Sequence, residues 1–131
     1  MKQVPESHAD IFDKPAFAHL STLMADGSPQ ASAVWVDTDG PLIMVNSAEG
    51  RLKDRNIRRD PRVAISVTDP ENPYRSLMIR GRVTKITNEG ADQHIDQMAK
   101  KYMGVEEYPF RTPDEVRVLY YIEPERIAAM G

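Results

Sequence analysis

The densest group of side chains that could do chemistry is the nine-residue segment 51–59, RLKDRNIRR. It contains four arginines, one lysine and one aspartate, and it therefore carries a local charge of +4. Because the whole chain carries −3, the rest of the sequence must carry −7. A local positive spot on an acidic protein suits a small anionic ligand better than a polyanion, and general nucleic-acid binding is not expected.

The start of this segment has the composition of an anion site. A helix is expected over 49–60, after a buried strand and before Pro61, and its first N–H groups are free to bind an anion. Arg51 and Lys53 fall in the first turn, where a cation costs up to about 1 kcal/mol. The alternative is an ordinary solvated helix face, and this applies best to Arg58 and Arg59, since cations are favoured near a helix C-terminus.

Other kinds of site find little support in the sequence. The chain has no cysteine, which excludes disulfides, thiolate metal sites and cysteine nucleophiles. His8, His19 and His94 fall on three separate expected elements without paired ligand spacing, so no metal site is predicted. There is no nucleophile elbow, P-loop or dinucleotide fingerprint, and the sequence assigns no catalytic residue.

The elements that must position the basic segment are mostly strands. Asp26-Gly27 marks a hairpin between two β-prone runs, and 41–47 reads as a strand buried on both faces. A short helix over 8–13 is expected to be capped by Ser7. The remaining elements expected are strands over 16–24, 28–38, 62–69, 76–86 and 116–124, a turn-rich loop over 69–74, a short strand in RIAAM, and a helix from Asn88 to Gly104.

These elements predict an α+β, mainly β fold: an antiparallel β-barrel of about six strands with flanking helices, in a single domain over 1–131. No apolar run is long enough to span a membrane as a helix. The first ten residues lack the apolar middle of a secretory signal, so a cytoplasmic location is the default expectation.

In order and spacing, the chain from about residue 10 onward resembles the pyridoxamine 5'-phosphate oxidase-like split-barrel family, and within it the branch of deazaflavin (F420)-dependent reductases. The residues that carry the resemblance are AHLSTLMADGSPQASAVWV (18–36), IMVNSAEGRLKDRNIRRDPRVAISV (43–67), DPENPYRSLMIRGRV (69–83), KYMGVEEYP (101–109) and EVRVLYYIEPERI (115–127). The resemblance implies a six-stranded split barrel of the FMN-binding type. It also implies a homodimer with two cofactor sites at the subunit interface.

Carried over position by position, the resemblance assigns Arg51, Lys53 and Asn56 to the cofactor phosphate. It places Val34, Trp35, Val45, Asn46 and Ser47 along the tricyclic ring and its ribityl chain. Arg80 and Gly81 would approach the cofactor tail, and Tyr74 and Arg75, together with Pro73, Tyr102 and Tyr108, are candidates for contacts across the dimer.

The resemblance favours coenzyme F420 as the cofactor, with FMN as the alternative. Both carry a ribityl phosphate, so Arg51 and Lys53 fit either. The deazaflavin adds an acidic oligoglutamate tail, for which Arg75, Arg80, Arg82 and Lys85 offer a basic track; the same residues are equally consistent with the polar outer face of a strand.

The implied activity is hydride transfer between the deazaflavin and a small electron-poor substrate such as an enone, a quinone or a lactone. This chemistry belongs to the cofactor, and the protein supplies positioning and electrostatics. A proton could come from water, Tyr74 or Tyr120. A protein that binds the cofactor without catalysis is the hypothesis from another class.

Overall fold

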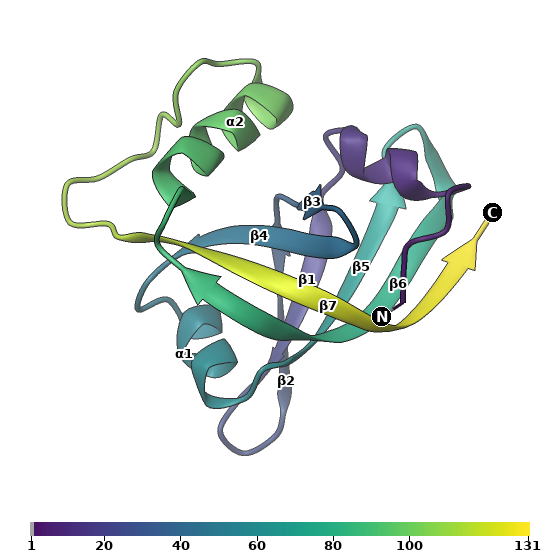
Figure 1. The fold of residues 1–131 in the computed structure, drawn as a ribbon, viewed down its shortest axis with the longest axis horizontal. Coiled ribbons are helices and arrows are strands. Elements are labelled where there is room, and N and C mark those ends of the chain that lie inside the picture. The colour runs from purple at the N-terminus through teal and green to yellow at the C-terminus, as the bar shows by residue number, and fades with distance from the viewer. Residues whose placement is uncertain (1) are drawn as a thin grey trace.

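The structure, a computed structural model, describes residues 2–131. Strands form most of it, with two α-helices and one short 3₁₀ helix (Figure 1). In chain order the elements are η1 (Ala9–Asp13), β1 (Ala18–Leu23), β2 (Pro29–Val34), β3 (Asp37–Asp39), β4 (Leu42–Ala48), α1 (Leu52–Arg59), β5 (Arg62–Asp69), β6 (Asn72–Thr87), α2 (Ala91–Met103) and β7 (Arg117–Met130).

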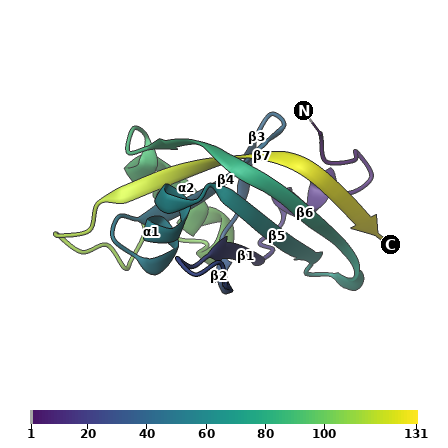
Figure 2. The same cartoon turned by 90° about the horizontal axis from the view of Figure 1, so that it is seen from below.

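The strands form one antiparallel sheet in the order β2-β1-β5-β6-β7-β4-β3. Figures 1 and 2 show the sheet strongly bent, so that β4 and β7 cross over β1 and β5. The predicted fold class is confirmed. The sheet has seven strands instead of six, because the expected strand over 28–38 divides into β2 and β3 on either side of Trp35 and Val36. The sheet is open, with β2 and β3 at its two edges.

The two longest strands, β6 and β7, bend at interruptions in their register, one of which falls between Arg80 and Gly81. The turn predicted within 69–74 is present at Pro70 and Glu71, but it is shorter than expected, since Asp69 already pairs with Asn72 in a tight hairpin. Pro73 is tolerated there because the register shift leaves 73–75 outside the β5–β6 ladder. RIAAM continues β7 and forms no separate strand.

The helices occur where they were expected, but their caps differ. α1 begins at Leu52, with Arg51 as its N-cap, because Gly50 turns the chain at φ +86°. The Ser7 hydroxyl bonds the His8 ring instead of capping η1. Gly90, with left-handed φ, precedes α2, while the Asn88 side chain donates to Glu49 and to the Arg117 carbonyl. Gly104 ends α2 as predicted.

Strand β4 lies between the main core and α2, and this decides which of its side chains can reach a ligand. Ile43 and Val45 are wholly buried in the main core, while Met44 packs with Ala91 of α2 and Leu119. Asn46 shares the α2 side with Met44, because side chains alternate along a strand. Neither α-helix in the described part of the chain is long and apolar enough to cross a membrane.

Candidate functional site: a cationic, aromatic-lined cavity

A cavity of about 210 Å³ opens beside the start of α1. We call it the cationic cavity. Its walls come from the end of β2, the middle of β4, α2, the loop before β7 and the first residue of β7. It is lined by Phe17, Ala33, Val34, Trp35, Asn46, Arg51, Lys53, Ile95, Tyr108, Phe110 and Arg117. Five of the residues assigned to the cofactor from the sequence therefore meet here, namely Val34, Trp35, Asn46, Arg51 and Lys53, and Tyr108, a candidate for a dimer contact, joins them.

Three cations converge on this cavity, and one carboxylate contacts two of them. Glu115 accepts from Arg117 Nη1 at 2.5 Å through Oε1 and from Arg51 Nη2 at 3.4 Å through Oε2. No ion pair among residues 2–131 involves Lys53. Arg51, Lys53, Arg117 and Glu115 together carry a net charge of +2. An anion in the cavity would therefore be attracted by positive charge that the protein does not neutralise itself.

The pKa of Lys53 reflects both its burial and this excess of positive charge. Burial lowers its pKa below the usual value, and the charges of Arg51 and Arg117 lower that pKa further. A bound anion would act in the opposite direction and favour the charged ammonium. The cavity is therefore electrostatically prepared for a negative group.

Arg117 and Asn46 belong to a buried polar network. Arg117 Nε donates to Asn46 Oδ1 at 2.9 Å, and Asn46 Nδ2 donates to the Ala91 carbonyl at 2.8 Å. The same Nδ2 lies 3.1 Å from His94 Nδ1, and His94 Nε2 lies 3.0 Å from Asp37 Oδ2. Burial alone would raise the pKa of Asp37, but the hydrogen bond from His94 and the Thr38 N–H leave it lowered, so the carboxylate is the favoured acceptor.

Aromatic rings form the other side of the cationic cavity. Trp35 stacks on Tyr102 with ring centroids 5.0 Å apart and planes 7° from parallel, and Tyr108 meets Trp35 edge-on at 6.1 Å. Phe110 continues the group beyond Tyr108, and Phe17 packs edge-on against Tyr102. A planar ring system attached to a phosphate would find both of its chemical halves matched in one place.

A family model described as pyridoxamine 5'-phosphate oxidase matches residues 4–131. The chain belongs to this family. A solved structure named F420 Reductase shares 32% sequence identity, with 95% of this chain and 98% of that chain covered and a TM-score of 0.83. A putative pyridoxamine 5'-phosphate oxidase from Listeria innocua shares 21% identity over 91% of each chain, with a TM-score of 0.68. A conserved hypothetical protein from Mycobacterium tuberculosis shares 22% identity, with coverages of 99% and 89% and a TM-score of 0.74.

Three of the residues that the family resemblance assigned to the ligand point elsewhere in this family member. Val45 and Ser47 are wholly buried on the side of β4 opposite Asn46. Asn56 is also wholly buried, and its amide donates to Thr22 Oγ1 at 3.1 Å and accepts from Arg59. Asn56 lies on the inner face of α1, where it ties the helix to β1, whereas Arg51 and Lys53 reach the cavity.

The residues predicted for the cofactor tail (Arg75, Arg80, Gly81, Arg82 and Lys85) do not line the cationic cavity, and neither does Tyr74, which is predicted to make a contact across the dimer. Arg75 is bound to Asp10, Asp69 and the Ser7 carbonyl, and Tyr74 is 81% exposed at the far end of β6. At Gly81 a Cβ atom would stand 2.2 Å from the Glu123 carbonyl, so its lack of a side chain admits the β7 backbone. Of the proposed basic track, Arg82 pairs with Glu125 and Lys85 lies over the Tyr121 ring.

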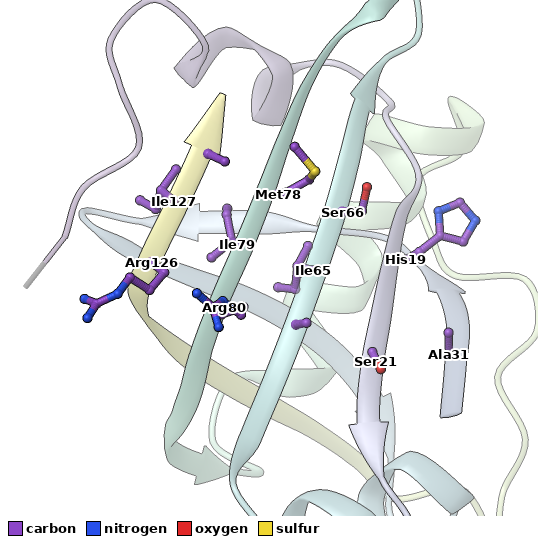
Figure 3. A pocket seen from close by; sticks show the side chains of 12 residues that line it. His19, Ser21, Ala31, Ile65, Ser66, Met78, Ile79, Arg80, Arg126 and Ile127 are labelled. Atoms are coloured by element: carbon purple, nitrogen blue, oxygen red, sulfur yellow. The ribbon is translucent and has the colours of Figure 1, made fainter. Parts of the chain in front are cut away.

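Arg80 lines a second, wider cavity of about 560 Å³ on the open face of the sheet. We call it the sheet-face cavity. Figure 3 shows its side chains standing on β1, β2, β5, β6 and the end of β7. It is mostly apolar, with Met78 45% exposed, and Arg80 and Arg126 stand opposite each other in register at one end. Neither of these arginines has a carboxylate partner among residues 2–131.

Sequence reasoning missed Arg117, Glu115 and the role of His94. From the sequence, His94 is considered only as a metal ligand, whereas the structure shows that it is only 6% exposed and bonds Asn46. A signal for Arg117 was available, because a charged residue at the start of the apolar run VRVLYYI must find a buried partner. What the sequence does not give is the β4–β7 register, which sets Arg117 opposite Ala48.

Proposed function

We propose that this protein is an oxidoreductase that binds coenzyme F420 and transfers a hydride between that deazaflavin and a small electron-poor organic substrate. The observation that carries the proposal is the cationic cavity, where three cations and one carboxylate stand beside an aromatic wall. Membership in the pyridoxamine 5'-phosphate oxidase family supports a flavin or deazaflavin cofactor. The 32% identical relative named F420 Reductase favours the deazaflavin.

The residues present fit such a cofactor. Arg51 and Lys53 would hold its phosphate, since both line the cavity at the start of α1 and their charge is not balanced within the protein. Trp35 and Val34 would contact the ring system. When bound, the deazaflavin supplies the hydride donor or acceptor, while these side chains orient the ring and exclude water from one face.

Neither of the two tyrosines considered as proton donors from the sequence lines the cavity. Tyr120 is wholly buried and donates to Asp54 at 2.7 Å, and burial together with Asp54 raises its pKa far above the usual value. Tyr74 lies on the distant end of β6. Water is therefore the proton source that we propose for the reduced product.

The second candidate cofactor is FMN, because the same phosphate contacts serve both molecules. Three of the four cations that suggested a tail track are engaged: Arg75 and Arg82 in ion pairs, and Lys85 over a tyrosine ring. Among residues 2–131, only Arg80 of these four has neither an ion pair nor a ring partner, so the preference for F420 now rests on the relative and not on the track.

We also propose that the cofactor site is completed in a homodimer. The cationic cavity, at about 210 Å³, is smaller than the roughly 300–1,000 Å³ typical of a cofactor pocket. The sheet-face cavity exposes apolar side chains that a second copy could cover, and Ala31 and Ala33 on the same face of β2 lead from one cavity to the other. Light scattering on the purified protein gives the mass; that of a single chain would contradict the dimer.

The cofactor is tested by titration of the apoprotein with F420 and with FMN. Trp35 is the only tryptophan and lines the cavity, so its fluorescence reports occupancy without a label. We expect quenching by both, with the lower dissociation constant for F420. Equal or tighter binding of FMN would reverse the choice of cofactor.

Turnover separates the enzyme from a protein that only binds the cofactor. Reduced F420 is mixed with the protein and a panel of enones, quinones and unsaturated lactones, and oxidation of the deazaflavin is followed by its absorbance. We expect at least one acceptor to be reduced in proportion to enzyme concentration. Tight binding with no turnover on any acceptor would favour the non-catalytic alternative.

A further inference from the structure

The proposed function leaves the most buried cation of the cationic cavity without a role. The Arg117 side chain is only 3% exposed, yet it lines the cavity. Within the described residues 2–131, Glu115 is the one carboxylate that pairs with Arg117, and Glu115 also contacts Arg51. A buried arginine shared in this way is not fully compensated, and burying a charge without full compensation is costly.

The guanidinium of Arg117 is held on two sides and open on a third. Its Nε donates to Asn46 and its Nη1 to Glu115, and its carbon lies 5.2 Å from the centre of the Tyr108 ring. Its Nη2 makes no hydrogen bond to any of residues 2–131. The Nη2 group of this fixed guanidinium is therefore left to donate to a ligand in the cavity.

The Asn46 amide is fixed because each of its atoms has a partner of one kind. Oδ1 accepts from Arg117, and Nδ2 donates to the Ala91 carbonyl, so the amide cannot be reversed without placing donor against donor. Because Nδ2 also faces His94 Nδ1, that ring nitrogen must accept. The ring proton then stands on Nε2, where it is donated to Asp37.

We propose that Arg117 is a third anion-binding residue of the cationic cavity, and that Asn46 and His94 are positioning residues that orient its guanidinium. The inference rests on the proposed function and names the ligand group as a phosphate oxyanion. Because Nε and Nη1 are already bonded, Nη2 is the donor left for such an oxyanion, and the planar guanidinium holds it in a fixed direction that the rotatable Lys53 ammonium does not have.

The test separates the phosphate contact from other effects by pairing each ligand with a counterpart that lacks phosphate. Dissociation constants are measured through Trp35 fluorescence for F420 and FMN, for the ribityl deazaflavin without phosphate, for riboflavin and for inorganic phosphate. We expect Arg117→Met to weaken the phosphate-bearing ligands by about tenfold or more and the phosphate-free ones by less than about twofold. Arg82→Met, which removes one exposed, ion-paired arginine, is the matched control.

Arg117→Lys keeps a charge but loses the Nε–H donated to Asn46. It should fall between the wild type and Arg117→Met, and it keeps the test valid should the methionine variant fold poorly. Equal weakening of phosphate-bearing and phosphate-free ligands in the Arg117 variants would overturn the inference. If the wild type binds neither cofactor, the proposed function fails instead, and the inorganic phosphate titration alone decides the role of Arg117.

The positioning role is tested at His94 by comparing a loss of the acceptor with its replacement. His94→Leu leaves the Asn46 amide with the Ala91 carbonyl as one acceptor instead of two, whereas His94→Asn presents an amide oxygen close to the position of Nδ1. We expect the leucine variant to lose severalfold in affinity for phosphate-bearing ligands and the asparagine variant to recover part of it. A fall in thermal stability with an unchanged ratio of FMN to riboflavin affinity would show a purely structural role.

Discussion

Two charge clusters of this protein each hold a largely buried arginine, and they differ in whether the charge is balanced. At one end of the sheet, Arg75 and Lys14 lie among the carboxylates of Asp10, Asp69 and Glu71, with Lys14 3.1 Å and Arg75 2.8 Å from Asp69. In the cationic cavity, Glu115 is the only carboxylate among residues 2–131 that pairs with Arg51, Lys53 or Arg117. The first cluster is satisfied by its own carboxylates, whereas the second retains positive charge for a ligand.

The comparison shows why counting cations along the sequence was a poor guide to the site. Arg75 looked like a ligand contact because it lies in a basic stretch, yet its partners in η1 and at the end of β5 use it fully. Arg117 has no basic neighbours in the sequence, yet it stands in the cavity. The useful quantity is the charge left over after internal pairing.

The largest expected effect is on ligand binding by the double variant Arg51→Ala/Lys53→Ala. Removing both charges takes the cavity from +2 to neutral, so we expect the affinity for F420 and FMN to fall by about a hundredfold or more. Trp35 fluorescence measures binding, and circular dichroism checks the fold. The control is Arg55→Ala/Arg58→Ala, which makes the same change of charge on the same helix outside the cavity. Undiminished affinity in the first variant would place the phosphate elsewhere.

The cluster of Arg75 and Lys14 with Asp10, Asp69 and Glu71, which we call the balanced cluster, should affect stability and not ligand binding. Arg75→Met removes the partner of Asp10 and Asp69 and frees the Ser7 carbonyl, so the melting temperature should fall clearly. Affinity for F420 and FMN should change by less than about twofold, since no contact of Arg75 reaches the cationic cavity. Thermal unfolding and titration on the same preparation test both parts. A large loss of affinity without loss of stability would restore Arg75 to the ligand site.

The division between predicted and unpredicted features follows the range of the interactions. Local signals worked: Gly104 ends α2, the segment 41–47 is a buried strand, and Arg51 with Lys53 marks the start of α1 at the cavity. Features that depend on strand register, or on the surface against which an element packs, were not predicted. The inward orientation of Asn56 and the position of Arg117 opposite β4 arise from tertiary packing, which no local pattern encodes.

A smaller effect is expected from Glu115→Gln, which makes the cavity more positive. The free protein should lose roughly 1–3 kcal/mol of stability, because Arg117 loses the one ionic partner that it has among residues 2–131. Affinity for phosphate-bearing ligands should rise by a few fold, since the ligand no longer competes with a carboxylate for Arg51 and Arg117. The measurements are thermal unfolding with and without ligand. A variant that binds these ligands more weakly than the wild type would show that Glu115 helps to hold the arginines in place.

The smallest effect is a pH dependence of the balanced cluster that the cationic cavity should not share. The Glu71 backbone N–H, together with Arg75 and Lys14, lowers the pKa of Asp69 from 3.8 to about 2. A carboxyl whose folded pKa is depressed adds stability above its unfolded pKa and loses that stability as pH falls, here between about 4 and 2. Asp69→Asn should therefore flatten the acid limb of the stability curve, whereas Glu107→Gln at an exposed position should leave it unchanged. Because Asp69 contacts none of the residues that line the cationic cavity, Asp69→Asn should not alter the affinity for F420 near neutral pH. A change there would mean that the two clusters are coupled through the sheet.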